Sequence, residues 1–238
     1  MRGFYIDPLY LVLVAPAILF ATWASWKVNS TFNKYSAINA ASGTTAEEAC
    51  QNLLNANGIS DVTIGKVPGE LTDHYDPTNK VINLSESVYG STSVAAIGVA
   101  CHEAGHAIQD AKDYAPMRLR DAIIPVTRIT SSLSMPLVIG GVLLSNYADM
   151  FIWVAYIGLI GFFMAALFQL ITLPAEFDAS KRALASIDSA GYLTAEELKG
   201  SKQVLDAAAL TYVSALAVSL MSMITMVIKV LRRERIRF

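Results

Sequence analysis

The residues of this 238-residue chain with the clearest chemical potential form the segment His102-Glu103-Ala104-Gly105-His106. Residues four apart share one helix face, so both imidazoles can reach one cation. Glu103 is rotated by about 100° from His102, which lets its carboxylate reach a water beside the cation without binding the cation. Zinc-dependent hydrolysis needs this arrangement: two neutral imidazoles bind Zn²⁺, and the carboxylate acts as general base toward a zinc-activated water. The alternative is a chance coincidence on a polar helix face, but two of the chain's 3 His lie in this segment.

Zinc in a hydrolase usually takes a third protein ligand and leaves a fourth position open. The metzincin arrangement would need Gly at position 109 and His at position 112, and Gln109 and Lys112 exclude it. The other arrangement takes a Glu from a later helix, and the candidates are Glu176, Glu196, Glu197 and Glu234. We favour Glu176 because it closes a long uncharged run, where a carboxylate is costly without a partner. An ordinary helix-end charge at a membrane interface is the alternative.

Four long uncharged runs must position these residues. They are Pro8–Trp26 (19 residues), Ile129–Ala148 (20), Met150–Ala175 (26) and Ala207–Ile228 (22). A helix needs about 20 apolar residues to cross a bilayer, so we expect four transmembrane helices. The first run could instead be a cleaved signal peptide, but Trp23 and Trp26 at its end suit a retained anchor.

Composition supports this class of protein and excludes others. Hydrophobic residues make up 54% of the chain and charged residues 16%, against about 25% charged in soluble domains. A net charge of -2 argues against nucleic acid as a partner, because binding phosphates requires a basic surface. The 2 Cys are too few for a disulfide framework.

Two polar stretches lie between the runs. Lys27–Arg128 holds 8 basic and 11 acidic residues, enough for a small folded domain, and Glu176–Asp206 holds 4 basic and 6 acidic residues, enough for two short helices. With four spans, the short link Asn146–Asp149 places both polar stretches on one side of the membrane. Glu176 would therefore emerge on the same side as His102.

Local signals in the larger polar stretch predict a helix, a hairpin and a second helix. Thr45 and Glu48 form a capping box that opens a helix to about Ala56, with Gly58 as its stop. Residues 62–67 and 81–84 are predicted strands, with turn residues at 76–79 between them. Residues 92–110, which include the zinc motif, have helical spacing of apolar residues.

The residues around the motif resemble the bacterial membrane zinc metallopeptidases of the YugP type. The resemblance covers nearly the whole chain. It rests on His102–His106 with Glu176-Phe-Asp-Ala-Ser180, on the segments Leu71–Pro77, Val81–Ser85 and Gly98–His102, and on Ala208–Val213. The chain is similar, more distantly, to the HtpX and CAAX-processing peptidases. The fold class that follows is a mainly α membrane protein with about four transmembrane helices and a small α+β zincin-like catalytic domain that contains the β-hairpin and the zinc-motif helix.

The resemblance implies a gluzincin-like site, with His102, His106 and Glu176 as ligands of one Zn²⁺ per chain and Glu103 as catalytic base. In the more distant relatives an Asp in the Glu-x-x-Ala-Asp motif orients a zinc-bound His, but this chain has Ser180 at that position. Asp110, one turn after His106, is a possible substitute on spacing alone.

The expected organisation has five parts. They are a transmembrane helix (residues 1–26), the catalytic domain (27–128), two transmembrane helices (129–175), the third-ligand helix with a connector (176–206), and a fourth transmembrane helix with a basic tail (207–238).

Three further features are candidates for binding substrate or stabilising the transition state. In related peptidases the substrate pairs with the strand before the zinc helix, so Val81, Ile82, Asn83 and Leu84 are predicted to accept an extended peptide at a sheet edge. His74 or Tyr75 could donate to the oxyanion, with Tyr212 as a weaker candidate. A hydrogen-bonded structural role is the alternative for His74.

The function expected from the sequence is that of a membrane-embedded zinc endopeptidase. Its substrate is a peptide or protein, which could itself be a membrane protein. The four spans contact the lipid bilayer. The alternative is a non-hydrolytic metal-binding or metal-transport protein, which would need ionisable residues within several spans. An intramembrane protease is a further alternative, but Ser87–Cys101 gives only 15 uncharged residues. Nothing in the sequence indicates an oligomeric state.

Basic residues give conflicting signals about the side of the cell membrane on which the site lies. Arg118, Arg128 and Lys181 flank the spans on the catalytic side, which the positive-inside rule places in the cytoplasm. The basic tail, with Lys229 and Arg232 among its residues, would lie on the opposite side. The basic residues that flank three of the spans favour a cytoplasmic site, and those that flank the fourth span oppose it.

Overall fold

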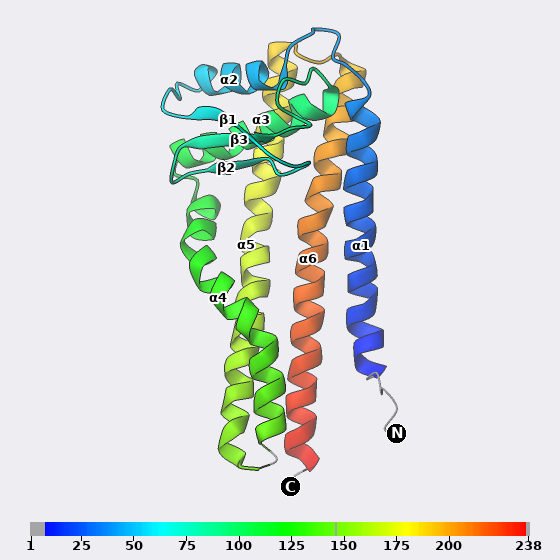
Figure 1. Cartoon of the computed structure of the whole chain (residues 1–238), viewed down its shortest axis with the longest axis vertical. Coiled ribbons are helices and arrows are strands. Elements are labelled where there is room, and N and C mark those ends of the chain that lie inside the picture. The colour runs from blue at the N-terminus through cyan, green and yellow to red at the C-terminus, as the bar shows by residue number, and fades with distance from the viewer. Residues whose placement is uncertain (1–7, 146, 237–238) are drawn as a thin grey trace. The chain divides into compact units, whose positions relative to one another are not determined.

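The computed structural model describes residues 8–145 and 147–236. Parts of three sequence predictions therefore lie outside the described residues: residues 1–7 of the first segment, Asn146 of the link, and residues 237–238 of the tail. The elements, in chain order, are α1 (Pro8–Ser36), α2 (Ala46–Ala56), β1 (Thr63–Val67), β2 (His74–Asp76), β3 (Val81–Ser85), α3 (Val94–Ala111), α4 (Ala115–Leu144), a 3₁₀ turn (Asp149–Phe151), α5 (Ile152–Ala190) and α6 (Ala195–Ile236) (Figure 1). The mainly helical class with a small sheet is confirmed.

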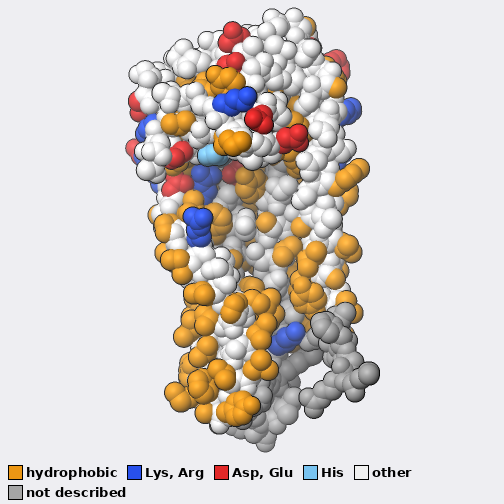
Figure 2. Space-filling model, viewed as in Figure 1, with side chains coloured by type: hydrophobic (Ala, Val, Ile, Leu, Met, Phe, Trp, Pro, Cys, Tyr) orange, Lys and Arg blue, Asp and Glu red, His pale blue; other side chains and the backbone are white. Residues whose placement is uncertain are grey.

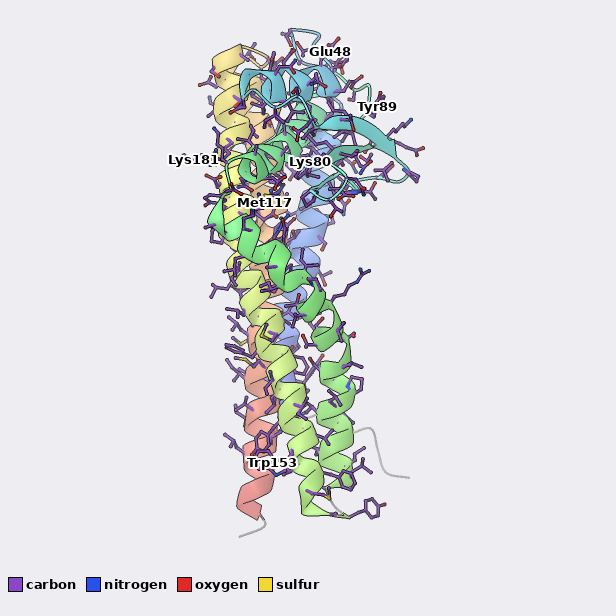
Figure 3. All side chains as sticks on the ribbon, turned by 90° about the vertical axis from the view of Figure 1, so that its left-hand side faces the viewer. Glu48, Lys80, Tyr89, Met117, Trp153 and Lys181 are labelled. Atoms are coloured by element: carbon purple, nitrogen blue, oxygen red, sulfur yellow. The ribbon has the colours of Figure 1, made fainter. Side chains whose placement is uncertain are left out.

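The described residues divide into two compact units, which we call the apolar unit and the polar unit. The apolar unit contains residues 8–23, 119–172 and 212–236. The four helices that contribute to it, α1, α4, α5 and α6, are long and apolar enough to cross a membrane. Hydrophobic side chains cover much of the visible face of α4 and α5 (Figure 2). Large hydrophobic side chains such as Trp153, labelled in Figure 3, and Ile160 are exposed on these helices. Such a surface fits contact with lipid.

Small residues let α4 and α5 approach closely within the apolar unit. A Cβ at Gly158 would lie 2.7 Å from the carbonyl oxygen of Ser134, and a Cβ at Gly161 would lie 2.7 Å from that of Thr130. Helices in lipid associate through such close backbone packing, because hydrocarbon provides no hydrophobic driving force between them.

The polar unit contains residues 24–118 and 173–211. Here α3 packs against α2 and against strands β2 and β3. Its core is formed by buried apolar side chains, among them Leu54, Ile82, Leu84, Ile97 and Ile108. The zinc-motif helix is therefore held on several sides by hydrophobic packing.

The predicted helix starts agree with the capping observed. The side chain of Thr45 accepts a hydrogen bond from the Glu48 N–H at 3.3 Å, and the Glu48 carboxylate accepts one from the Thr45 N–H at 3.0 Å. This pair is the predicted capping box of α2. Helix α3 has a similar start at Ser93, whose hydroxyl accepts from the Ala96 N–H at 3.2 Å.

The predicted pairing of the strands is wrong. Strands β1 and β3 are parallel, and the hairpin is formed by β2 and β3, giving the order β1-β3-β2. The turn at Asp76 is correct: its carboxylate accepts hydrogen bonds from the Thr78 and Asn79 N–H groups. Strand β2 has only three residues, too few for an alternating pattern, and it takes the antiparallel place beside β3 that the hairpin prediction gave to residues 62–67.

This topology corrects the substrate-strand prediction. Val81, Ile82, Asn83 and Leu84 lie in β3, which pairs on both sides and is the central strand. Its backbone groups are already used within the sheet, so it has no free edge for a peptide. The outer strands of the described sheet are β1 and β2.

The prediction of two short helices between the third and fourth spans is also wrong. Residues 176–190 continue α5 without a break, and α6 begins at Ala195 and runs on into the fourth apolar run. The helix ends only at Gly191, whose φ of 68° suits glycine. Pro174 lies inside α5 just before Ala175 and Glu176, and the helix continues through this proline and through the change in polarity.

Gly105 allows α3 and α5 to meet. A Cβ at Gly105 would lie 2.7 Å from the carbonyl oxygen of Ala179 and 3.1 Å from its Cα, and Ala175, Ala179 and Ala183 are fully buried on α5. We expect Gly105→Ala to force the helices apart and to lower the free energy of unfolding by about 1–3 kcal/mol. Thermal unfolding measures this, with Gly140→Ala as the control, because a Cβ at Gly140 has no neighbour within 4 Å.

Candidate metal centre

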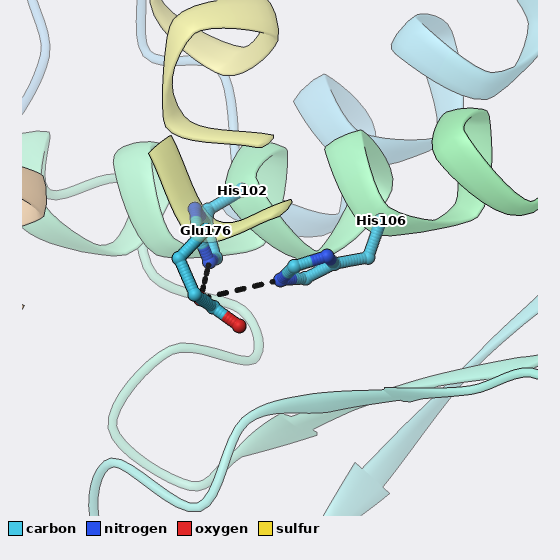
Figure 4. A group of neighbouring side chains, drawn as sticks. All are labelled: His102, His106 and Glu176. Carbon is cyan, nitrogen blue, oxygen red and sulfur yellow. Dashed lines mark ion pairs between the residues drawn. The ribbon is translucent and has the colours of Figure 1, made fainter. Parts of the chain in front are cut away.

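His102, His106 and Glu176 converge in the polar unit. The two histidines lie one turn apart on α3, and Glu176 reaches them from α5 (Figure 4). The Glu176 Oε2 is 3.3 Å from the Nε2 of His102 and 3.5 Å from the Nε2 of His106. Glu176 and His106 are buried, whereas His102 is partly exposed. One ligand atom from each residue therefore faces a common point.

These three residues fit a zinc ion by distance and by donor chemistry. Distances of 3.3 and 3.5 Å are long for hydrogen bonds. Two ligands that each lie about 2.1 Å from a tetrahedral ion are about 3.4 Å apart, close to the two histidine–glutamate separations. All three ligand atoms lie within 4.8 Å of one another. Two imidazoles and one carboxylate also form a known catalytic zinc set, which leaves one position open.

Gln109 fixes the ring of His106. Its amide nitrogen donates to the Ala175 carbonyl at 2.8 Å and to the Asp178 carboxylate at 2.9 Å. Both partners only accept, so the amide oxygen must be the atom that faces the Nδ1 of His106 at 3.0 Å. An amide oxygen also only accepts, which requires the proton on Nδ1. The lone pair of His106 is then on Nε2, toward Glu176.

Ser180, not the predicted Asp110, is the side chain at the Nδ1 of His102. The hydroxyl of Ser180 is 3.1 Å from the Nδ1 of His102. The carboxylate of Asp110 instead accepts from the Tyr75 hydroxyl at 2.8 Å and from the Lys80 ammonium at 2.6 Å. Asp110 follows His106 by four residues, but its side chain is engaged with β2 and with the β2–β3 turn, where Lys80 is labelled in Figure 3.

Replacement of the residues behind the histidines is expected to weaken zinc binding without removing it. Gln109→Ala should lower zinc affinity about 10- to 100-fold, as is typical when the partner of a ligand is lost. Ser180→Ala should also lower zinc affinity, whereas Ser180→Asp should retain it because a carboxylate can accept from Nδ1. Competition with a zinc chelator measures each affinity. Ser189→Ala, an exposed position on α5, should leave affinity unchanged.

Asp110 joins three elements around the site. Besides Tyr75 and Lys80 it pairs with Arg118 of α4, whose guanidinium lies 3.2 Å away. Although burial opposes ionisation, the hydrogen bonds from Lys80 and Tyr75 hold the pKa of Asp110 below its usual range. Asp110 therefore connects α3 to the hairpin and to the start of α4 while it remains charged.

Glu103 follows His102 on α3, and its carboxylate interacts electrostatically with His102 and Glu176. It is buried, with 8% of its surface exposed. Burial raises the pKa of Glu103 to about 7; the nearby His102 opposes the rise, and the Glu176 carboxylate adds to it. A base with such a pKa can both take up and return a proton near neutral pH.

The predicted oxyanion donors are engaged elsewhere. His74 lies on β2, with Nδ1 2.8 Å from the Thr72 carbonyl and Nε2 3.2 Å from the Asn83 amide. The Tyr75 hydroxyl donates to Asp110. Both ring nitrogens of His74 and the Tyr75 hydroxyl thus have protein partners in this structure. Tyr212 lies on α6 in the apolar unit, and its role stays a prediction.

The other candidate glutamates have different places. Glu197 accepts hydrogen bonds from the N–H groups of Ala41 and Thr194, and Glu196 pairs with Lys199 on the surface. The side chain of Glu234 lies outside the part that the structure describes. Of the four candidates, only Glu176 is grouped with the histidines among the described residues.

The sequence did not predict that Gln109 contacts His106 or that Ser180 contacts His102. A signal existed for each: Gln109 is three residues after His106, and Ser180 is four residues after Glu176, so each shares a helix face with a ligand. The contact that gives Ser180 its role joins residues 78 positions apart, which helical spacing alone does not predict.

Two histidines from one helix and a glutamate from a second define a class of zinc peptidase site on a mainly helical chain. The chain belongs to the family described as "Putative neutral zinc metallopeptidase", whose model matches residues 10–231. It is 44% identical over 219 residues to the "Putative membrane protease YugP" of Bacillus subtilis (strain 168), covering 92% of this chain and 95% of that protein. No solved structure matches the chain. The family resemblance stated from the sequence is confirmed.

Proposed function

We propose that this protein is a zinc-dependent endopeptidase of the cell membrane, with one zinc ion held by His102, His106 and Glu176. The observation that carries the proposal is the convergence of their ligand atoms at separations of 3.3 and 3.5 Å, next to the buried carboxylate of Glu103. Family membership and the four membrane-length helices support it.

A zinc ion at this site would supply Lewis-acid polarisation of a water and of the peptide carbonyl. Glu103 would accept the proton of the attacking water and then return it to the nitrogen of the leaving amine. His106 would keep its Nε2 lone pair directed at the site, because the Gln109 amide oxygen accepts from Nδ1. The Ser180 hydroxyl can accept from the Nδ1 of His102 in the same way. The chain thus contributes a base, a proton donor and fixed ligands.

We place the peptide along β2. An extended peptide adds to a sheet through the unpaired backbone groups of an outer strand. The outer strands here are β1 and β2, and β2 packs against α3, the helix that carries the histidines. The substrate would be a peptide or protein in extended form, membrane proteins included.

Metal removal tests the proposal. The full-length protein, purified in a neutral detergent, should contain one zinc per chain and should cleave an unstructured probe such as fluorescently labelled casein. Removal of zinc with a chelator should abolish cleavage, and added zinc should restore it, because Glu103 alone is a weak catalyst.

Two results would count against the proposal. Cleavage that continues after complete loss of zinc would exclude the site as the catalyst. Zinc transport into vesicles by a protein that cleaves none of a broad set of peptides would favour the metal-transport alternative.

A further inference from the structure

A cavity of about 460 Å³ opens among α4, α5 and α6 in the apolar unit. Its polar lining includes Arg128 and Ser131 of α4, Gln169 of α5 and Ser219 of α6, and Ile124 and Phe168 add apolar surface. Several polar side chains around one cavity are unusual on helices whose surface is otherwise apolar, because polar groups in contact with hydrocarbon are costly.

The polar lining is rich in hydrogen-bond donors. Arginine has five N–H donors and no acceptor, the Gln amide adds two donors, and each Ser hydroxyl adds one. In the part of the chain that the structure describes, none of these four side chains forms a hydrogen bond or ion pair. Among the described residues, no acidic side chain lines the cavity. Its complement is therefore a group with several acceptor oxygens and a negative charge.

The position of the cavity along the helices matches the depth of phospholipid headgroups. Helix α4 ends at Leu144 and α5 begins at Ile152. Arg128 lies 16 residues before that end and Gln169 lies 17 residues after that beginning, so each is about 24–26 Å from the α4–α5 link. The hydrocarbon layer is about 30 Å thick. If the link lies at one interface, the cavity lies near the other.

The surface beside the cavity suits acyl chains. Ile129 and Leu170, next in sequence to Arg128 and Gln169, are 63% and 56% exposed. A molecule with an anionic head and apolar tails would therefore meet donors in the cavity and hydrocarbon-like side chains beside it.

The geometry points to a lipid site: this cavity binds the phosphate group of an anionic phospholipid. Arg128 forms the ion pair, which a guanidinium can make with two phosphate oxygens at once, and Gln169, Ser131 and Ser219 donate the remaining hydrogen bonds. This inference rests on the proposed membrane placement of the four helices, not on the peptidase activity.

Lipid retention tests the site. Full-length protein in maltoside micelles is equilibrated with equal amounts of dioleoyl phosphatidylglycerol and dioleoyl phosphatidylcholine, and bound lipid is counted by native mass spectrometry. Wild type should retain phosphatidylglycerol preferentially, and Arg128→Gln should reduce its affinity about tenfold or more. Arg120→Gln is the matched control, because Arg120 is on the same helix, pairs with Asp121 and does not line the cavity.

A second pair of variants covers the case in which Arg128→Gln fails to fold. Arg128→Lys retains the charge and should keep the preference with lower affinity, since an ammonium cannot bind two oxygens in the same way. Gln169→Leu should also lower phosphatidylglycerol affinity. The preference should weaken as salt is raised, because the ion pair is partly screened.

Three outcomes would overturn the assignment. Equal retention of the two lipids by wild type would exclude a preference for anionic lipid. Unchanged retention by Arg128→Gln would exclude Arg128 as the phosphate-binding residue. Displacement of phosphatidylglycerol by millimolar inorganic phosphate, or by a transmembrane peptide with an acidic residue, would assign the cavity to a small anion or to a protein segment.

Discussion

Glu103→Gln is expected to keep its zinc and to lose peptide hydrolysis by about 10²- to 10⁴-fold, the usual contribution of a general base. Glu103 is next in sequence to His102, but its carboxylate is not grouped with the three ligand atoms among the described residues. The amide is nearly the same size, so the buried site should keep its packing, but it cannot accept the proton. Zinc content and initial rates on the same purified samples give the two readouts.

Comparison with the histidine variants makes this result specific. His102→Ala and His106→Ala should lose both zinc and activity, since two ligands are too few for a catalytic site. Glu86→Gln is the control for a glutamate in the same unit, and as an exposed residue it should leave both readouts unchanged. Full activity in Glu103→Gln would exclude Glu103 as the general base, whatever the zinc content.

The long helices were the most predictable part of the fold. Uncharged runs of 19–26 residues have few solutions other than apolar helices, and the capping box at Thr45 fixed a helix start with residues only three apart. The continuation of α5 past Glu176 was not predicted, because a change from apolar to polar sequence looks like an element boundary. Polarity changes the solvent that a helix meets, whereas α5 ends where Gly191 adopts a positive φ.

The sheet was less predictable for a physical reason. The parallel pairing of Thr63 with Val81 depends on the three-residue strand His74–Asp76 taking the other edge of β3. Such a short strand has little intrinsic preference and is held by its neighbours, among them Asp110, which accepts a hydrogen bond from Tyr75. Strand order is thus determined by tertiary contacts that alternation of residues does not encode.

The centre of the site was predictable from spacing, and its surroundings were not. His102 and His106 are a local pattern on one helix. The grouping with Glu176 required the expectation that two polar stretches share one side, together with the family resemblance. The bonds of Gln109 to Ala175 and Asp178 depend on the close approach of α3 and α5 at Gly105, a contact between segments about 70 residues apart.

Glu176→Ala is expected to lower zinc affinity by more than the factor of about 100 that marks the loss of a ligand's partner, because it removes a ligand itself. The carboxylate is the anionic member of the set, and its side chain is only 4% exposed, so solvent provides a poor replacement. Activity should fall in parallel at limiting zinc. Titration with zinc in the presence of a competing chelator measures the change, and the same samples are assayed for cleavage.

Two matched substitutions separate this effect from a general loss of structure. Glu196→Ala removes a surface carboxylate at 84% side-chain exposure and should change neither zinc affinity nor stability. Glu197→Ala removes the acceptor for the Thr194 and Ala41 N–H groups at the start of α6, which should cost about 1 kcal/mol of stability while zinc affinity stays normal. If Glu176→Ala kept wild-type zinc affinity while one of these two variants lost it, the assigned third ligand would be wrong. If Glu176→Ala loses zinc while the zinc-free protein unfolds as wild type does, the carboxylate is a ligand and not a packing residue. Loss of a packing residue would also lower the stability of the zinc-free protein.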